Sequence, residues 1–283
     1  MLQGRHIAIA RKTPMAATLA TVELVARTDV PSCGKSGGRT PLVRDSWGTA
    51  LTRAAESALE VIGCGRAIRR ATGHLVTPCE RALEMQRASA RIGKTVGLSV
   101  EVHGEAPTRP CVIVANHVSY LDPIAVATTV PMTAIAKSEV RGWPAIGSAL
   151  SALGVLFVQR GDPGSGAVAL RKAMRAVDAG VPVLVFPEGT TTYGDDVLPF
   201  ERGAFGLGAL KGVPIVPVAV RYSVRDAAWV GDTDFVPHFV ALHRYPQVVA
   251  YLRFGRSLDA RDFEGARALA TVARNEVRSL LEP

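Results

Sequence analysis

Short apolar runs alternate with helix-like segments over residues 99–283. Apolar runs of about four to eight residues that end in Gly, Pro or polar residues are typical of buried strands, whereas longer segments with an apolar stripe are typical of helices. This alternation predicts an α/β domain, with a mixed, mostly parallel sheet flanked by helices. The predicted strands cover 99–103, 111–115, 132–136, 155–159, 182–186, 215–220 and 248–254, and the predicted helices cover 122–129, 142–152, 164–179, 202–211 and 261–281.

The pattern before residue 99 is different and predicts two further segments. Residues 1–45 combine basic side chains with Gly, Pro and Ser and are predicted to form a poorly structured basic tail or linker. Residues 46–98 are rich in Ala, Leu, Arg and Glu and are predicted to be helical. The helix over 80–94 is amphipathic, so it can dock on its own domain or lie on a lipid surface. Its polar stripe consists of Glu80, Glu84, Arg87, Arg91 and Lys94.

An uncharged stretch of 18 residues, Gly142–Gln159, is at the lower length limit for a membrane-spanning helix. It contains Pro144 and is interrupted at Gly154, which favours a short helix followed by a buried strand. The first 28 residues place basic side chains before a weakly apolar stretch, but Glu23 interrupts that stretch. A cleaved signal peptide is therefore not expected.

The charge is distributed unevenly along the chain. The net charge is +8; residues 1–98 carry 15 Lys/Arg and 7 Asp/Glu, whereas residues 99–283 carry 18 of each. A basic lead segment on a neutral body predicts contact with a polyanion, either nucleic acid or an anionic membrane surface. Aromatic residues make up only 6% and no nucleic-acid-binding motif is present, so nucleic acid is not the expected partner.

The cysteines and histidines indicate neither a disulfide framework nor a metal site. Cys33, Cys64, Cys79 and Cys111 show no paired spacing, which favours a reducing cytoplasm. The six histidines are scattered without a neighbouring cluster of Cys or carboxylates, so no metal is expected.

Polar residues gather after several of the predicted strands. Because ligands bind at the carboxyl ends of strands in such sheets, these residues predict one common site. They are Asn116, His117, Ser119 and Asp122 after the second predicted strand, Lys137 after the third, Gln159 and Arg160 at the end of the fourth, and Glu188, Gly189 and Thr190 after the fifth.

His117 is the candidate general base of this site. A neutral imidazole can take the proton of an alcohol, and Asp122 could accept the other ring N–H and fix the tautomer. The spacing alone equally allows a structural alternative, in which the two residues cap the helix predicted to begin at 122.

Four blocks of the sequence resemble the glycerolipid acyltransferase family, of the lysophosphatidate acyltransferase type. NHVSYLD (116–122) resembles the family's N-H-x-x-x-x-D block. GVLFVQRG (154–161), VFPEGTTTYG (185–194) and VPIVPVAV (213–220) resemble the other three blocks in the family's order, and LPFERGAF (198–205) fits the stretch after the third. The resemblance covers about residues 100–222 and does not extend to residues 1–98.

The resemblance implies a mechanism. His117 would be the general base and Asp122 its partner, and the hydroxyl of a lysolipid would attack the thioester of acyl-CoA or acyl-carrier protein directly. No metal or organic cofactor would be needed. Arg160 would hold an acceptor phosphate, and Lys137 would help to bind an anionic group.

The third block would shape the acceptor pocket through Glu188, Gly189 and Thr190. Glu188 is expected to bind a hydroxyl or a backbone N–H, or to steady Arg160, because a carboxylate is an unsuitable direct ligand for phosphate.

One departure from the family pattern bears on the acceptor. Where phosphatidate-forming members commonly continue E-G-T-R, this chain has Thr191. Loss of a fixed cation weakens phosphate binding, and the E-G-T-T form resembles the branch that acylates lyso-ornithine lipid. Two acceptors therefore remain open. The first expectation is 1-acyl-glycerol-3-phosphate, and the alternative is lyso-ornithine lipid or another lysolipid.

Lipid substrates imply a membrane location. The fatty chains would keep acceptor and product in the bilayer, so the protein is expected on the cytoplasmic face of the cell membrane, peripheral or monotopic, with residues 46–98 in contact with it. The alternative from another class is a non-catalytic protein that binds lipid or membrane.

Overall fold

The structure is a computed structural model that describes residues 44–74, 77–143 and 146–282. The predicted basic tail therefore lies outside the described residues, except for residues 44 and 45. Seven strands form one sheet in the order β1-β7-β6-β2-β5-β3-β4. All neighbouring pairs are parallel except β6 and β7, which are antiparallel, so the predicted mixed, mostly parallel sheet is confirmed. The strands are β1 Leu98–His103, β2 Val112–Ala115, β3 Thr133–Lys137, β4 Leu156–Val158, β5 Val183–Val185, β6 Ile215–Tyr222 and β7 Val248–Phe254.

β2 lies in the middle of the sheet and is buried on both faces. Its side chains alternate between two hydrophobic clusters: Val112 and Val114 pack with residues of α5, α6 and α8, whereas Ile113 and Ala115 pack with residues of α2, α3 and α4. A strand covered on both faces has no polar face, which explains why it is a continuous apolar run in the sequence.

The helices of residues 99–283 lie close to their predicted positions. They are α3 Asp122–Thr129, α4 Ile146–Ala152, α5 Pro163–Asp178, α6 Gly203–Lys211 and α8 Ala266–Leu281. Two of them begin later than predicted, α4 because the 3₁₀ helix η2 Ser138–Gly142 precedes it, and α8 because Gly265 has a φ of +86° that an α-helix does not allow. The other 3₁₀ helices are η1 Thr72–His74, η3 Arg225–Ala227 and η4 Ala260–Asp262.

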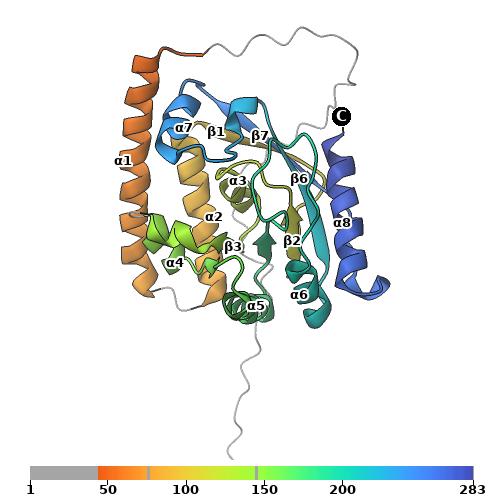
Figure 1. Cartoon of the computed structure of the whole chain (residues 1–283). Coiled ribbons are helices and arrows are strands. Elements are labelled where there is room, and N and C mark those ends of the chain that lie inside the picture. The colour runs from red at the N-terminus through yellow and green to blue at the C-terminus, as the bar shows by residue number, and fades with distance from the viewer. Residues whose placement is uncertain (1–43, 75–76, 144–145, 283) are drawn as a thin grey trace, which may run out of the picture. The chain divides into compact units, whose positions relative to one another are not determined.

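The predicted helical segment before residue 99 contains two α-helices, α1 Trp47–Ala71 and α2 Pro78–Thr95. α2 begins where it does because the side chains of Thr77 and Glu80 accept hydrogen bonds from each other's backbone N–H, and Pro78 occupies the first helical position. α2 packs against α3 and β1, and α1 packs against α2, α4 and α7. α1 is thus the outermost helix on one side of the sheet, and α8 covers the sheet on the opposite side (Figure 1).

The sequence analysis did not predict α7 Phe235–Leu242. Its sequence, FVPHFVAL, is almost entirely apolar and contains Pro237, so it shows no polar face by which a helix would be identified. The uncharged stretch over 142–159 contains α4 and β4, as predicted. Among the helices that the structure describes, none combines the length and apolar character needed to cross a bilayer.

Candidate active site

The predicted site residues follow neighbouring parallel strands. β5, β2 and β6 lie side by side and run in the same direction. Their carboxyl ends therefore meet at one edge of the sheet, where the loop 116–121 after β2 faces the loop after β5 and the last residue of β6.

His117 and Asp122 form a close pair in this loop. Nδ1 of His117 lies 2.7 Å from Oδ2 of Asp122, and the Asp122 side chain is fully buried while that of His117 is 18% exposed. A ring that donates Nδ1–H to the carboxylate keeps its lone pair on Nε2 when neutral. Nε2 makes no hydrogen bond within the described residues and is not among their buried unpaired atoms, so it is free to accept a proton.

The Asp122 carboxylate accepts hydrogen bonds from the loop that precedes α3 and from the end of β6. The backbone N–H groups of Val118 and Ser119 donate to Oδ2 at 2.7 and 3.0 Å, and the hydroxyl of Tyr222 donates to Oδ1 at 2.6 Å. The N-cap position of α3 is Leu121, and no side chain caps the helix. The alternative interpretation of His117 and Asp122 as helix caps is therefore wrong.

The loop after β5 holds His117 from the other side. Oε1 of Glu188 accepts the backbone N–H of His117 at 2.7 Å, and the backbone N–H of Thr192 donates to the His117 carbonyl at 2.7 Å. The ring of Phe186 stacks on the imidazole with centroids 4.0 Å apart and planes at 15°. These contacts fix both the backbone and the ring of His117.

Glu188 uses both carboxylate oxygens on backbone N–H groups. Oε2 accepts the N–H of Leu198 at 2.9 Å, in addition to the bond from His117. Burial raises the pKa of Glu188, although the two backbone N–H groups and His117 act in the opposite direction. Of the roles expected for this carboxylate, the structure therefore shows backbone binding.

The other predicted residues of the third block lie beside Glu188. Gly189 occupies a turn with a φ of +73°, and its N–H donates to the carbonyl of Phe186. Thr190 is exposed. Among the described residues, neither forms a hydrogen bond with the imidazole, and their predicted part in the acceptor pocket stays a prediction.

The two predicted cations lie at the surface. Arg160 is exposed, follows β4 and makes no hydrogen bond or ion pair with the described residues. Lys137, the last residue of β3, forms an ion pair with Glu139 at 3.0 Å. The structure thus brings Asp122 and Glu188 into contact with His117 and leaves both cations at the carboxyl ends of β3 and β4.

Asn116 and Tyr222 are structural parts of the site. The sequence analysis placed Asn116 in the common site without assigning it a role, and it did not include Tyr222. The buried Asn116 side chain accepts the N–H of Val220 at 2.7 Å and donates to its carbonyl at 3.0 Å, which joins the end of β2 to β6. Tyr222 was missed because the predicted strand ended at residue 220. The alternation of Val218, Val220 and Tyr222 on one face of β6 is the signal that could have extended it.

Half-buried aromatic side chains from four segments pack together beside the His117 loop. The loop itself supplies Tyr120, whose ring lies 5.6 Å from that of Trp229 and 5.0 Å from that of Phe235. Trp143 lies 4.8 Å from Phe235. The backbone N–H of Trp229 donates to the carbonyl of Val118 at 2.9 Å, so this aromatic cluster is attached directly to the His117 loop.

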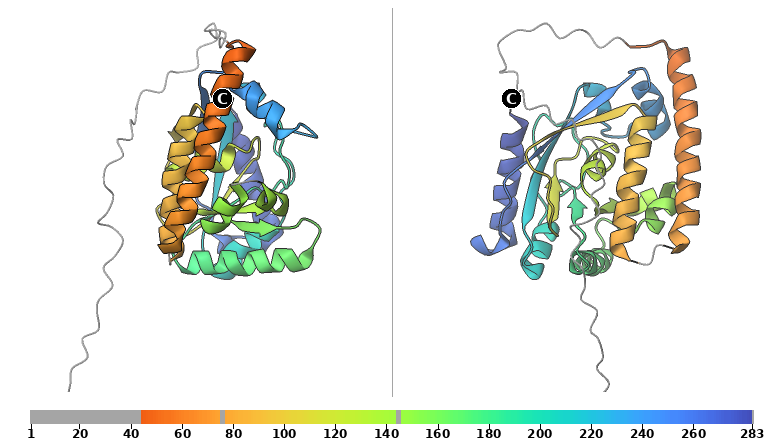
Figure 2. Two further views of the ribbon diagram at one scale, coloured as in Figure 1. Left: turned by 90° about the vertical axis from the view of Figure 1, so that its left-hand side faces the viewer. Right: turned by 180° about the vertical axis from the view of Figure 1, so that it is seen from behind.

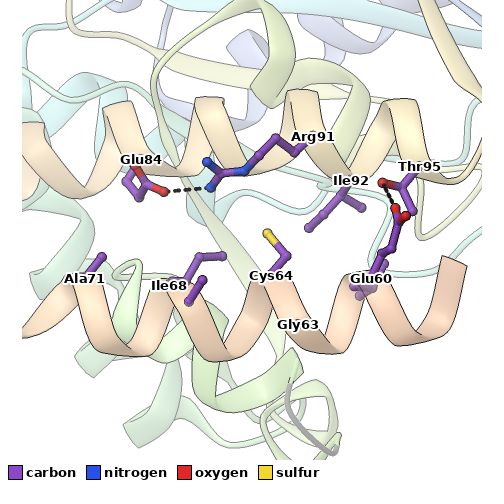
Figure 3. Close-up of a pocket in the computed structure, with 11 residues that line it drawn as sticks. Glu60, Gly63, Cys64, Ile68, Ala71, Glu84, Arg91, Ile92 and Thr95 are labelled. Atoms are coloured by element: carbon purple, nitrogen blue, oxygen red, sulfur yellow. Dashed lines mark hydrogen bonds and ion pairs between the residues drawn. The ribbon is translucent and has the colours of Figure 1, made fainter. Parts of the chain in front are cut away.

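A separate cleft of about 470 Å³ lies between α1 and α2. Figure 3 shows Cys64 and Ile68 of α1 opposite Arg91 of α2, whose guanidinium donates to Glu84 at 2.9 Å. None of the predicted site residues lines this cleft, so it is distinct from the edge of the sheet that holds His117.

Comparisons of the sequence with known proteins find a family and several relatives. The model of the family described as Acyltransferase matches residues 99–221. A lyso-ornithine lipid O-acyltransferase of Pseudomonas aeruginosa is 33% identical over 217 residues, which cover 75% of this chain and 83% of that protein. A 1-acyl-sn-glycerol-3-phosphate acyltransferase of Neisseria meningitidis is 29% identical over 180 residues, which cover 62% of this chain and 69% of that protein.

The fold is also similar to a solved structure. The crystal structure of the 1-acyl-sn-glycerophosphate acyltransferase PlsC from Thermotoga maritima superposes with a TM-score of 0.64, over 83% of this chain and 93% of that chain. The sequence identity is 21%, so this similarity concerns the fold.

Proposed function

Because this chain belongs to the acyltransferase family, we propose that it moves a fatty acyl group from the thioester of acyl-CoA or acyl-carrier protein to the hydroxyl of a lysolipid. The observation that carries the proposal is the contact of 2.7 Å between His117 Nδ1 and the buried Asp122 carboxylate, with Nε2 left free. Such an arrangement suits a general base for an alcohol.

The reaction can be written with these residues alone. Nε2 of neutral His117 takes the proton of the acceptor hydroxyl, and the electron pair of the O–H bond forms the new C–O bond at the thioester carbonyl. The C–S bond breaks with its electron pair on sulfur, and the imidazolium returns the proton to that sulfur. Asp122 fixes the tautomer and stabilises the imidazolium while it exists.

Direct transfer, without an acyl-enzyme, fits the surroundings of His117. A covalent route needs a serine or cysteine that hydrogen-bonds to the base. Ser119 is fully buried and its Oγ has no hydrogen-bond partner among the described residues, and no described serine or cysteine bonds to Nε2. The donor arrives as an activated thioester, so the proposed reaction requires no metal or organic cofactor.

Lyso-ornithine lipid is the acceptor that we favour. The similarity to the lyso-ornithine lipid O-acyltransferase of Pseudomonas aeruginosa is longer and higher than that to the glycerol-phosphate enzyme of Neisseria meningitidis. Thr191 in place of an arginine removes one fixed cation for a phosphate monoester. Arg160 supports 1-acyl-glycerol-3-phosphate as the second candidate, because its guanidinium is exposed and unpaired within the described residues.

We place the enzyme on the cytoplasmic face of an anionic membrane through α1. This helix of 25 residues is the outermost helix on its side of the sheet (Figure 2, left). Trp47, Leu51 and Leu59 expose 55%, 56% and 71% of their surface. Exposed apolar side chains in a basic segment are typical of a helix that lies in the lipid interface.

Acyl transfer tests the chemistry. The full chain is assayed with a long-chain acyl-CoA or acyl-carrier protein and lyso-ornithine lipid, 1-acyl-glycerol-3-phosphate or lysophosphatidylethanolamine in mixed micelles. His117→Ala should lose about 10²–10⁴ in kcat, the usual contribution of a general base, and Asp122→Asn should also be impaired. His103→Ala, which removes an exposed histidine at the end of β1, is the matched control. Full activity of His117→Ala would disprove the mechanism.

The acceptor and the membrane contact are tested separately. A higher kcat/KM of the wild type for 1-acyl-glycerol-3-phosphate than for lyso-ornithine lipid would reverse our order of acceptors. Vesicle binding without turnover of any thioester would indicate a non-catalytic lipid-binding protein. Leu59→Ser should weaken binding to vesicles that contain phosphatidylglycerol, whereas Leu210→Ser, at an equally exposed position on α6, should not.

A further inference from the structure

We propose that Tyr222 is a positioning residue that acts on His117 through the Asp122 carboxylate. The inference rests on the proposed function, in which His117 is the base. Tyr222 is the last residue of β6, and its hydroxyl donates to Asp122 Oδ1 at 2.6 Å. A phenol, a carboxylate and an imidazole thus form one chain of hydrogen bonds from β6 to Nδ1 of His117, whose Nε2 is free.

The two carboxylate oxygens of Asp122 have different partners. Oδ2 accepts from the His117 ring and from two backbone N–H groups of the same loop. Oδ1 accepts from Tyr222, which lies 100 residues further along the chain. Among the described residues, Tyr222 therefore supplies the side-chain bond that fixes the rotation of the carboxylate from outside the loop.

β6 holds the Tyr222 hydroxyl in a defined place. Tyr222 pairs with Ala250 of β7, and two residues earlier Val220 is bonded on both its N–H and its carbonyl by Asn116 of the His117 loop. Burial and the neighbouring Asp122 carboxylate raise the pKa of Tyr222 well above 10. The hydroxyl therefore stays protonated and remains a donor over the whole range in which a histidine titrates.

The charged and titratable groups near the imidazole come from three neighbouring segments and from the His117 loop itself. Asp122 begins α3, Glu188 follows β5 and contacts the His117 backbone, and Tyr222 ends β6. Tyr120 lies in the His117 loop, and its hydroxyl forms a hydrogen bond with His238 of α7. Of these groups, Tyr222 donates directly to the carboxylate that accepts the hydrogen bond from the imidazole ring. Loss of the hydrogen bond from Tyr222 leaves more negative charge on the Asp122 carboxylate. The carboxylate then attracts the imidazolium more strongly, which disfavours the neutral form of His117.

Tyr222→Phe removes the hydroxyl and keeps the ring. We expect kcat to fall about 10- to 100-fold, the range that corresponds to one hydrogen bond to a charged group, with KM for the acceptor little changed. The acid limb of the pH–rate profile should move to higher pH. Tyr251→Phe, at a half-buried position of β7 whose hydroxyl makes no hydrogen bond with the described residues, should match the wild type.

A measurement on the resting protein keeps this inference separate from the proposed function. The Nδ1 proton of His117, assigned by its absence from the spectrum of His117→Ala, should move downfield in Tyr222→Phe because the carboxylate becomes a stronger acceptor. If the wild type transfers no acyl group, the proposed function fails, and this resonance still tests the coupling.

A purely structural role would give a different result. In that case Tyr222→Phe would lower the melting temperature and reduce activity equally at all pH values, with the Nδ1 proton unmoved, and the inference would be wrong. If Tyr222→Phe does not fold, 2,3-difluorotyrosine at position 222 retains the ring and makes the hydroxyl a stronger donor. The acid limb should then move to lower pH, and an unchanged profile would overturn the inference.

Discussion

Replacement of Glu188 by glutamine tests whether this carboxylate braces the His117 loop. Its two oxygens accept the N–H groups of His117 and Leu198 at 2.7 and 2.9 Å, and the residue is 8% exposed. An amide has one oxygen and one NH₂ group, so whichever way it is turned, one backbone N–H faces a donor.

The magnitude follows from these contacts. One charged hydrogen bond is lost, which costs about 1.5–3 kcal/mol, and the neutral amide recovers part of the burial cost that raises the pKa of Glu188. We expect a net loss of about 1–2 kcal/mol in the free energy of unfolding, or a melting temperature lower by about 2–8 °C. A displaced His117 should lower kcat about 10- to 100-fold, because small misplacements of a catalytic group are costly.

Thermal unfolding and steady-state kinetics measure these effects on the same preparations. Glu201→Gln is the matched control, because Glu201 is exposed and lies in the same connection between β5 and α6. An unchanged melting temperature together with a higher KM for the acceptor alone would refute the bracing role. Glu188 would then contact the acceptor.

Three further predictions concern other parts of the fold. Asn116→Ala leaves the buried N–H and carbonyl of Val220 unpaired, so urea unfolding should show a loss of about 2–5 kcal/mol, whereas Asn275→Ala on the exposed face of α8 should be neutral. If the Arg160 guanidinium binds the anionic group of the acceptor, Arg160→Ala should raise KM for the acceptor about 10-fold relative to the control variant Arg171→Ala. An unchanged KM would exclude that contact. Burial lowers the pKa of His238 and of His243 below 6.5. At lower pH the unfolded chain therefore binds more protons at these two residues than the folded chain does. The free energy of unfolding should fall as the pH drops below about 6.5. His243→Gln should reduce this slope in urea titrations, and the same slope as in the wild type would contradict it.

Residue spacing made His117 and Asp122 a candidate pair, although spacing alone left the helix-cap alternative open. His117 and Asp122 are five positions apart and follow a strand that is apolar because it is buried on both faces. One short loop between β2 and α3 is enough to bring them together. The sequence analysis located the strands within about two residues, because each strand is a short apolar run that ends where the chain leaves the sheet.

Contacts between distant segments were not predictable in this way. Glu188 is 71 residues from His117, and Tyr222 is 100 residues from Asp122. A pattern of apolar and polar positions has no information on which strands become neighbours. Only the order β5-β2-β6 places the ends of these segments around the imidazole.

The sequence by itself determined the α/β class, the position of each strand and the candidate pair His117 and Asp122 in the loop after β2. The tertiary structure decided the antiparallel pairing of β6 with β7, the division of the first helical segment into α1 and α2, and the partners of Glu188 and Asp122. The physical reason is range: periodicity and turn residues act over a few positions, whereas the partner of a buried polar group depends on which distant segment packs against it.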